Sequence, residues 1–319
     1  MYGIHLEPDI QPELHLREQP AMKLSPKTAA RTPKPAWLRR PLPKGPAYES
    51  VRKLIRDGQL HTVCQEAKCP NQFECFSQHT ATFLIMGGIC TRNCRFCNVQ
   101  GGTPRPLDPQ EPLRVAQAAQ TLKLRYVVVT SVTRDDLADG GAAHFAATIA
   151  ALRQRIEKVQ VEVLVPDFRG ELSALATVLE AGPHVLNHNL ETVARLYPRV
   201  RPGADYQRSL DLLAAASRHS AEIPAKSGLM LGLGEQEAEI CHTLADLRSH
   251  GVRLLTLGQY LQPSTDHLPV ERYLPPEEFH RWRRIALEMG FSDVAADPFV
   301  RSSYRAKELY RRMDQNPLE

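Results

Sequence analysis

Short apolar runs alternate with stretches of helical periodicity from residue 81 onward. This alternation predicts repeated strand-helix units and a parallel sheet. We expect six strands, at residues 82–87, 125–132, 159–167, 184–189, 226–234 and 253–260.

Amphipathic segments separate these apolar runs. In residues 138–157, four apolar side chains recur at i, i+4, i+7 and i+11 on one helical face, namely Phe145, Ile149, Leu152 and Ile156. Six such units fit a (β/α) barrel better than a doubly wound sheet. The predicted fold class is therefore α/β, a partial (β/α)6 TIM-type barrel.

Polar residues gather where three of the predicted strands end. Barrel folds place their chemistry at the C-terminal ends of strands, so these positions are candidates for an active site. Taken singly, each is better explained as a helix cap or a turn bond. The second strand leads to Thr130, Ser131, Arg134, Asp135 and Asp136, the fourth to Asn187, His188, Asn189 and Glu191, and the sixth to Gln259 and Gln262.

The bulk composition predicts a globular protein outside the membrane. The chain has 319 residues, of which 42% are apolar, enough to fill a core. No apolar stretch is long enough to cross a bilayer, and the first twenty residues carry charges where a signal peptide is apolar. We therefore expect a cytoplasmic protein, in which clustered cysteines are more often metal or redox sites than disulfides.

A basic, proline-rich segment precedes the predicted barrel. Residues 21–46 hold seven Lys or Arg, six Pro and no acidic residue, which predicts an extended arm over residues 1–46. Trp37 and Leu38 are large apolar residues in this arm, so we expect them to pack on the body or on a partner.

Six of the seven cysteines fall into two triplets between positions 64 and 97. Disulfides are disfavoured, because each triplet leaves an odd thiol. A Cys3His zinc site remains possible, with His61 or His79 as fourth ligand, and so does an iron-sulfur cluster, which requires thiolates. The triplets are Cys64, Cys69 and Cys75, then Cys90, Cys94 and Cys97.

The seventh cysteine, Cys241, lies between Ile240 and Leu244 on an apolar helical face. It is predicted to be an inert core residue.

The second triplet follows the first predicted strand. Three thiolates in one loop can hold three irons of a 4Fe-4S cluster and leave the fourth iron open. The spacing C-x3-C-x-F-C, with Phe96 before Cys97, resembles the signature of the radical S-adenosylmethionine superfamily. That resemblance implies a partial barrel and cleavage of S-adenosylmethionine to a 5'-deoxyadenosyl radical. The run MLGLGE at residues 230–235 resembles a strand motif that flanks the adenosyl group there.

The first triplet narrows the resemblance to one family. With it come KPAWLR, TSVTRDDLADGGA, NHNLETV, SGLMLGLGE and RSSYRA at residues 34–39, 130–142, 187–193, 227–235 and 301–306, and together they resemble lipoyl synthases. The resemblance implies insertion of two sulfur atoms at C6 and C8 of an octanoyl group on a lysine of a carrier domain. It also implies an auxiliary-cluster segment at 47–80, a radical domain at 81–270 and a closing C-terminal helical segment at 271–319.

The resemblance assigns site residues by position. Cys90, Cys94 and Cys97 would hold the cluster that binds S-adenosylmethionine. The auxiliary, sacrificial 4Fe-4S cluster would have Ser303 as its fourth ligand, although sequence alone would make Ser303 a helix N-cap. Its thiolate ligands would be Cys64, Cys69 and Cys75, and the expected S-adenosylmethionine contacts are Thr130, Ser131, Asn187, Asn189 and Glu191.

The resemblance also implies partners. These are octanoylated lipoyl carrier domains of 2-oxoacid dehydrogenases and the glycine cleavage H protein, a low-potential electron donor such as ferredoxin or flavodoxin, and an iron-sulfur cluster carrier. The basic arm would steer the acidic surface of the carriers. Neither nucleic acid nor membrane is an expected partner.

Two other functions fit the sequence less well than sulfur insertion into an octanoyl group. A methylthiolase acting on tRNA or a ribosomal protein needs a further substrate-binding domain, for which we expect no room after residue 319. A non-enzymatic zinc or iron-sulfur scaffold with a nucleic-acid arm lacks an aromatic-rich basic face, since aromatics make up only 6% of the chain.

Overall fold

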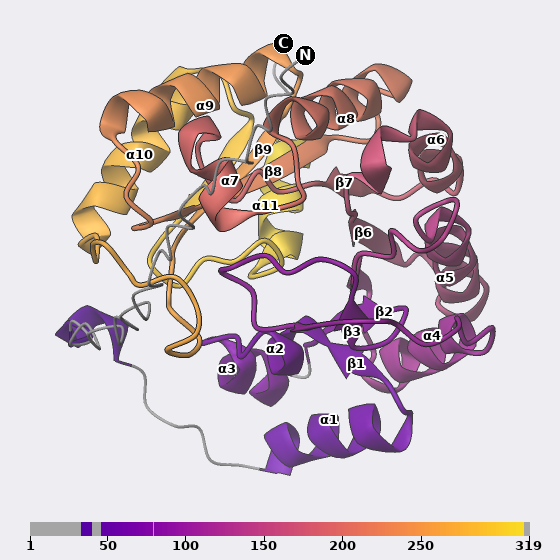
Figure 1. The fold of residues 1–319 in the computed structure, drawn as a ribbon. Helices are drawn as coiled ribbons and strands as arrows, with labels where there is room; N and C mark the ends of the chain where they lie inside the picture. Colours follow the sequence, from indigo (N-terminus) through magenta and orange to yellow (C-terminus); the bar gives the residue numbers. More distant parts are fainter. Residues whose placement is uncertain (1–32, 40–45, 79, 316–319) are drawn as a thin grey trace, which may run out of the picture. The chain divides into compact units, whose positions relative to one another are not determined.

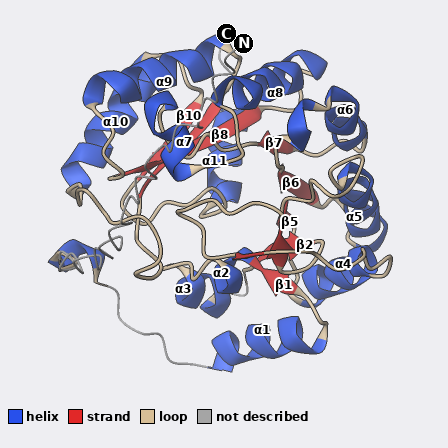
Figure 2. Cartoon of the chain, in the orientation of Figure 1, coloured by secondary structure: helices blue, strands red, loops and turns tan. Residues whose placement is uncertain are grey.

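A curved sheet of parallel strands, covered on its outside by helices, organises the compact unit that spans residues 33–319 (Figure 1, Figure 2). This computed structural model describes residues 33–39, 46–78 and 80–315. Within them the main sheet has eight strands, in chain order β1 (His61–Thr62), β2 (Thr82–Ile85), β5 (Tyr126–Ser131), β6 (Gln160–Leu164), β7 (Val185–Asn187), β8 (Ala225–Leu231), β9 (Leu254–Gln259) and β10 (Asp293–Ala296). Neighbours in this order pair in parallel, except that β1 is antiparallel to β2.

The helices that follow the strands bury one apolar face each against the sheet. On α5, Phe145, Ile149 and Leu152 are almost completely buried, as the helical spacing predicts. The outer helices are α4 (Glu111–Thr121), α5 (Ala142–Arg155), α6 (Leu172–Glu180), α8 (Tyr206–His219), α9 (Glu237–Ser249) and α10 (Pro276–Glu288), with the short α7 (Tyr197–Val200) after β7. None of the helices in the described residues is both long and apolar enough to span a bilayer.

The N-terminal helices are attached to the edge of the sheet. They are α1 (Pro46–Asp57), α2 (Val63–Glu66) and α3 (Gln72–Ser77), preceded by the 3-10 turn η1 (Ala36–Leu38). Thr62 ends β1 and its hydroxyl caps α2, accepting the Gln65 N–H at 3.3 Å. This cap fixes the start of the short helix that carries Cys64.

The C-terminal helix α11 (Ala306–Gln315) packs at the end of the barrel where the parallel strands begin. Leu309 and Met313 pack with Val185 and Leu254, which lie at the starts of β7 and β9. The helix therefore lies at the N-terminal ends of the barrel strands.

Most of the predicted architecture is confirmed. All six expected strands are present, and the fold class is a partial TIM-type barrel. The strand β10 was missed, because two aspartates and two alanines interrupt the apolar run in the segment SDVAAD.

Two side-chain predictions at the periphery had mixed outcomes. The prediction that Cys241 is buried was wrong, because α9 turns Ile240 and Leu244 inward while Cys241 is exposed. Leu38 is buried as expected, whereas Trp37 is 43% exposed. Most of the predicted basic arm, residues 1–32 and 40–45, lies outside the described residues.

Candidate active site

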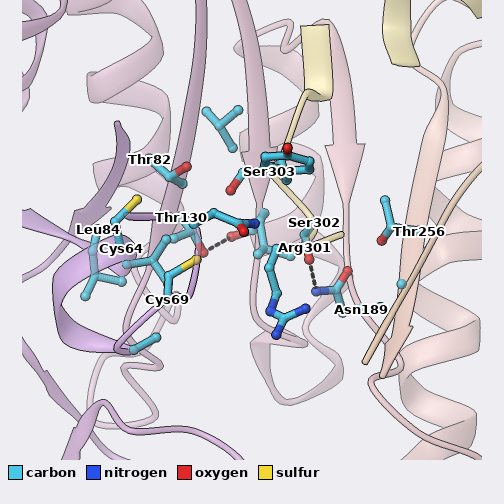
Figure 3. A pocket seen from close by; sticks show the side chains of 18 of the residues that line it. Cys64, Cys69, Thr82, Leu84, Thr130, Asn189, Thr256, Arg301, Ser302 and Ser303 are labelled. Carbon is cyan, nitrogen blue, oxygen red and sulfur yellow. Dashed lines mark hydrogen bonds between the residues drawn. The ribbon is translucent and has the colours of Figure 1, made fainter. Parts of the chain in front are cut away.

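A cavity of about 770 Å³ is lined by all six clustered cysteines and by Ser303. Its walls come from α2, α3 and the loop after α2, from the C-terminal ends of several strands, from the turn before β5, and from the loop before α11 with the first residues of that helix. In Figure 3, Cys64 and Cys69 lie on one side of the pocket, and Ser302 and Ser303 lie between them and Asn189. The structure thus unites two cysteine triplets and a serine that is more than 200 residues away in sequence.

The loop of the second triplet is closed at its base. Ile89 and Cys90 form the strand β3 (Ile89–Cys90), which pairs with β4 (Gln100–Gly101), and the Gly102 N–H donates to the Cys90 carbonyl at 2.9 Å. The backbone N–H groups of Arg92 and Thr133 point at the Cys90 sulfur, at 3.4 and 3.3 Å. Hydrogen bonds to sulfur tune iron-sulfur clusters, so this loop suits a thiolate ligand.

Arg92 fastens the same loop to the barrel. Its guanidinium contacts Asp135 at 2.7 Å and Asp167 at 2.6 Å, and only 7% of the Arg92 side chain is exposed. Burial opposes ionisation of Asp167, but the hydrogen bonds and charge of Arg92 win and lower the pKa of Asp167 to about 2. The loop is therefore held by a permanently charged pair.

Burial keeps several of the thiols neutral until they meet a metal. Burial, with a smaller contribution from neighbouring Cys94 and Cys90, raises the pKa of Cys97 to about 12. Burial likewise raises the pKa of Cys94 and of Cys64, the latter with a contribution from Cys69. These interactions show that the thiols of each triplet lie close together, and that metal loading must displace protons.

The donor set fits iron-sulfur clusters. Across the residues the structure describes, no group of three His, Cys, Asp or Glu side chains is arranged to hold a single metal ion. A cluster distributes its soft thiolate ligands over several irons. Two triplets of thiols around one cavity match this requirement. Of the histidines considered as zinc ligands, His61 pairs with Glu66 at 2.8 Å and His79 lies outside the described residues.

Two hydrogen bonds join the first triplet to the segment of Ser303. The Asn71 side chain donates to the Phe299 carbonyl at 2.7 Å, and the Tyr304 hydroxyl donates to Glu74 at 2.8 Å. Both partners on the N-terminal side lie between or beside the cysteines of the triplet. Ser303 does not begin the final helix, since α11 starts three residues later, at Ala306.

Four of the five predicted cofactor contacts line the cavity. They are Thr130, Ser131, Asn189 and Glu191, whereas Asn187 is not a lining residue and lies against Glu162, at 3.5 Å. Within the described residues, the buried Ser131 Oγ and Asn189 Oδ1 have no hydrogen-bond partner. Unpaired buried polar atoms are costly, and these two atoms at the cavity are available to pair with a polar ligand.

Sequence reasoning missed Arg201. This residue is buried, lines the cavity and donates to the Asn189 carbonyl at 2.8 Å. Burial raises the pKa of Glu191, although the charge of Arg201 opposes the shift. The segment YPRVRPG holds two arginines, Arg199 and Arg201, and the sequence gives no signal that Arg201 is the one that turns inward.

From the sequence, His188 is one of several polar residues at the end of the predicted fourth strand. Its Nδ1 lies 2.8 Å from the Val165 carbonyl, so Nδ1 carries the proton, and Nε2 is buried without a partner among the described residues. Burial lowers the pKa of His188 to about 4. His188 is therefore a neutral imidazole that offers an acceptor nitrogen at the cavity wall.

Comparisons with known proteins agree with the site. The model of the radical SAM superfamily matches residues 84–247, and that of the N-terminal domain of lipoyl synthase matches residues 8–69. Lipoyl synthase of Acidithiobacillus ferrooxidans is 54% identical over 289 residues, which cover 90% of this chain and 91% of the relative. Lipoyl synthase of Thermus thermophilus is also 54% identical, over 88% of both chains.

Solved structures share the fold at low sequence identity. Methylornithine synthase has a TM-score of 0.51 at 12% identity, covering 84% of this chain and 88% of that one. The FeFe-hydrogenase maturase of Carboxydothermus hydrogenoformans has a TM-score of 0.52 at 13% identity, covering 84% and 77%. At this level of identity the likeness concerns the fold alone.

Proposed function

The chain belongs to the lipoyl synthase family of the radical S-adenosylmethionine superfamily, and from this premise we propose how its residues divide the reaction. It is an enzyme that inserts two sulfur atoms, at C6 and C8, into a protein-bound octanoyl-lysine to give lipoyl-lysine. The hydrogens to be removed are on unactivated methylenes, which no side-chain base can deprotonate at an accessible pKa. The family therefore uses two 4Fe-4S clusters and S-adenosylmethionine.

We assign the second triplet, Cys90, Cys94 and Cys97, to the cluster that binds S-adenosylmethionine. We assign the first triplet and Ser303 to the auxiliary cluster. When bound, the cluster of the second triplet would supply the electron that cleaves S-adenosylmethionine, and the auxiliary cluster would supply the inserted sulfur. The single observation that carries this division is that both triplets and Ser303 line one cavity.

The chain's own residues hold and orient the reactants. Ser131, His188 and Asn189 present unpaired polar atoms at the cavity wall and are proposed to bind the cofactor. Apolar side chains from several strands also line the cavity and would shield a radical from water, among them Leu84, Val128, Leu229 and Met230.

Of its partners, this enzyme acts on lipoyl carrier proteins and needs a reductant. We propose that the carriers are the lipoyl domains of 2-oxoacid dehydrogenases and the H protein of glycine cleavage. We further propose that ferredoxin or flavodoxin supplies electrons and that an iron-sulfur carrier rebuilds the auxiliary cluster. The basic side chains of Lys34, Lys123, Arg125 and Lys307 among the lining residues favour an acidic carrier.

We propose that the enzyme works in the cytoplasm. All seven cysteines are free, and a reducing compartment keeps thiols available for iron.

Anaerobic reconstitution tests the assignment directly. The loaded chain should hold about eight irons and convert an octanoylated carrier peptide to the lipoyl form when given reductant and S-adenosylmethionine. About four irons in the parent chain would remove the auxiliary cluster from the proposal.

Two matched variants separate the clusters. With Cys64, Cys69 and Cys75 all changed to Ala, the chain should still release 5'-deoxyadenosine but form no lipoyl group. With Cys90, Cys94 and Cys97 all changed to Ala, it should keep about four irons and cleave no S-adenosylmethionine. Lipoyl formation by either variant would contradict the division of roles.

A further inference from the structure

An ion pair is buried inside the barrel behind the cavity wall. Lys226 on β8 and Glu162 on β6 lie 2.7 Å apart, with side chains 1% and 0% exposed, and neither lines the cavity. Replacing a buried pair by apolar residues is often neutral or stabilising, so the pair is weak evidence for stability. The other contacts of Lys226 and Glu162 indicate a role in positioning the C-terminal loop.

Lys226 makes a second hydrogen bond, to the C-terminal loop. Its Nζ donates to the Ser302 carbonyl at 2.7 Å. Glu162 is itself held, because its second carboxylate oxygen accepts the Tyr126 hydroxyl at 2.6 Å. Burial and the charge of Glu162 raise the pKa of Tyr126, so this hydroxyl stays a donor. The ammonium is therefore locked in one place.

Ser302 is also fixed on its side-chain side. Its hydroxyl accepts a hydrogen bond from the Asn189 amide, next to the proposed cofactor site. The adjoining backbone is pressed against β9, where a Cβ on Gly258 would lie 2.1 Å from the Val300 carbonyl oxygen. The segment after β7 and the strands β8 and β9 thus each contact residues 300–302.

We infer that Lys226 is a positioning residue for Ser303, the fourth ligand of the auxiliary cluster in the proposed function on which this inference rests. The Ser302 carbonyl belongs to the peptide plane whose nitrogen is that of Ser303. Fixing this plane fixes the Cα of Ser303, the point from which its side chain reaches the cavity shared with Cys64 and Cys69 (Figure 3).

A hard oxygen ligand needs such support more than a thiolate does. Serine oxygen binds iron-sulfur sites weakly, so the entropy of ordering a free loop would compete with the bond. A loop that is already in position removes that cost. Lys226 supplies this order from outside the cavity and leaves the ligand itself free to depart.

The test uses the full chain with Cys90, Cys94 and Cys97 changed to Ala, so that only the auxiliary cluster gives a signal. After reconstitution, the reduced cluster is examined by EPR with and without added cyanide, and iron loss to a chelator is timed. In this background Lys226→Met/Glu162→Gln should behave like Ser303→Ala, with a cyanide-shifted spectrum and iron loss about tenfold faster than the parent. Glu162→Gln alone keeps the amine donor and should resemble the parent.

A remote buried carboxylate provides the matched control. Glu111 accepts from His144 at 2.7 Å and does not line the cavity, so Glu111→Gln should leave the spectrum unchanged. A parent-like spectrum for Lys226→Met/Glu162→Gln, beside a shifted Ser303→Ala, overturns the inference and leaves the proposed function intact. An unshifted Ser303→Ala overturns the assignment of Ser303 and the inference together.

Folding is checked by thermal melting before the cluster is measured. If Lys226→Met/Glu162→Gln does not fold, the apolar triple variant Lys226→Met/Glu162→Met/Tyr126→Phe replaces it. The triple variant should show the same cyanide-shifted spectrum, and a parent-like spectrum from it overturns the inference.

Discussion

Ser303 differs from the six thiols around the cavity in one chemical property. In the proposed assignment its oxygen would be a hard ligand on a soft cluster, so it should leave more readily than thiolate, which suits a cluster that is consumed. We expect Ser303→Cys to keep its iron but to form lipoyl groups at least about tenfold more slowly. The measurement is iron content together with single-turnover conversion of an octanoylated peptide.

Cys241→Ser serves as the control for this substitution, because Cys241 is exposed on α9 and does not line the cavity. It should leave both iron content and rate unchanged. Native-rate conversion by Ser303→Cys would show that a labile ligand is not required.

Asp167 carries a pH-dependent part of the stability of the cluster loop. Its pKa is lowered to about 2 from an ordinary value of 3.8, so its contribution is complete above pH 4 and is lost as pH falls toward 2. We expect Asp167→Asn to reduce the free energy of unfolding by about 2 kcal/mol at pH 7, and the difference from the parent to shrink below pH 4. Urea unfolding at pH 7 and pH 3 measures both values.

The surface pair of Asp108 with Arg114 gives the comparison. The Asp108 side chain is 48% exposed, so Asp108→Asn should change unfolding little at either pH. Equal effects of the two substitutions would contradict a special role for the buried pair.

Candidate ligands could be named from the sequence, but the residues that support their positions could not. Thiol spacing and the RSSY motif pointed to the six cysteines and to Ser303. Lys226 and Glu162 each appear as one charge within an apolar strand, a pattern that predicts pairing because such charges are rarely buried alone. The sequence does not reveal that the partners lie on β8 and β6.

At the scale of elements, strand β9 tests how the C-terminal loop is seated. A methyl group on Gly258 would collide with the Val300 carbonyl, and backbone cannot move aside cheaply. We expect Gly258→Ala to displace the loop of Ser303 and lower reconstituted iron from about eight toward about four per chain. S-adenosylmethionine cleavage should persist, measured as 5'-deoxyadenosine.

Gly203→Ala separates collision from backbone strain. Gly203 has a φ of +90° with nothing within 4 Å of its added Cβ, so its substitution strains the backbone alone. Full iron loading in Gly203→Ala and reduced loading in Gly258→Ala are expected. Full loading in both would mean that the loop tolerates displacement.

Elements with a strong apolar period were predictable, and elements that depend on distant partners were not. The run at 125–132 reads as a strand on its own and forms β5. By contrast, β1 has two residues and exists through its pairing with β2. Cys241 shows the limit of periodicity, since a one-residue step turns a helical side chain by about 100° and here moves it from core to surface.

At the scale of the whole described unit, the site depends on joining its two ends. Asn71 with Phe299 and Glu74 with Tyr304 are more than 220 residues apart in sequence. No local pattern encodes such contacts, so only the family resemblance could place Ser303 beside the first triplet. β1 and β10 occupy the two edges of the curved sheet, and these two hydrogen bonds link the segments that follow them.

Exposed basic side chains that line the cavity carry the charge expected to meet the carrier. Lys123 and Arg125 line the cavity, are exposed and lie at the start of β5, beside the closing helix. We expect Lys123→Glu/Arg125→Glu to raise KM for an acidic carrier at least about tenfold with kcat nearly unchanged, because encounter and not chemistry is affected. For the parent, kcat/KM should fall as salt rises, and the variant should lose most of that dependence.

Arg218→Glu/Arg284→Glu makes the same change in net charge on outer helices away from the cavity and should keep the parent's KM. Equal effects of the two pairs would mean that net charge alone attracts the carrier.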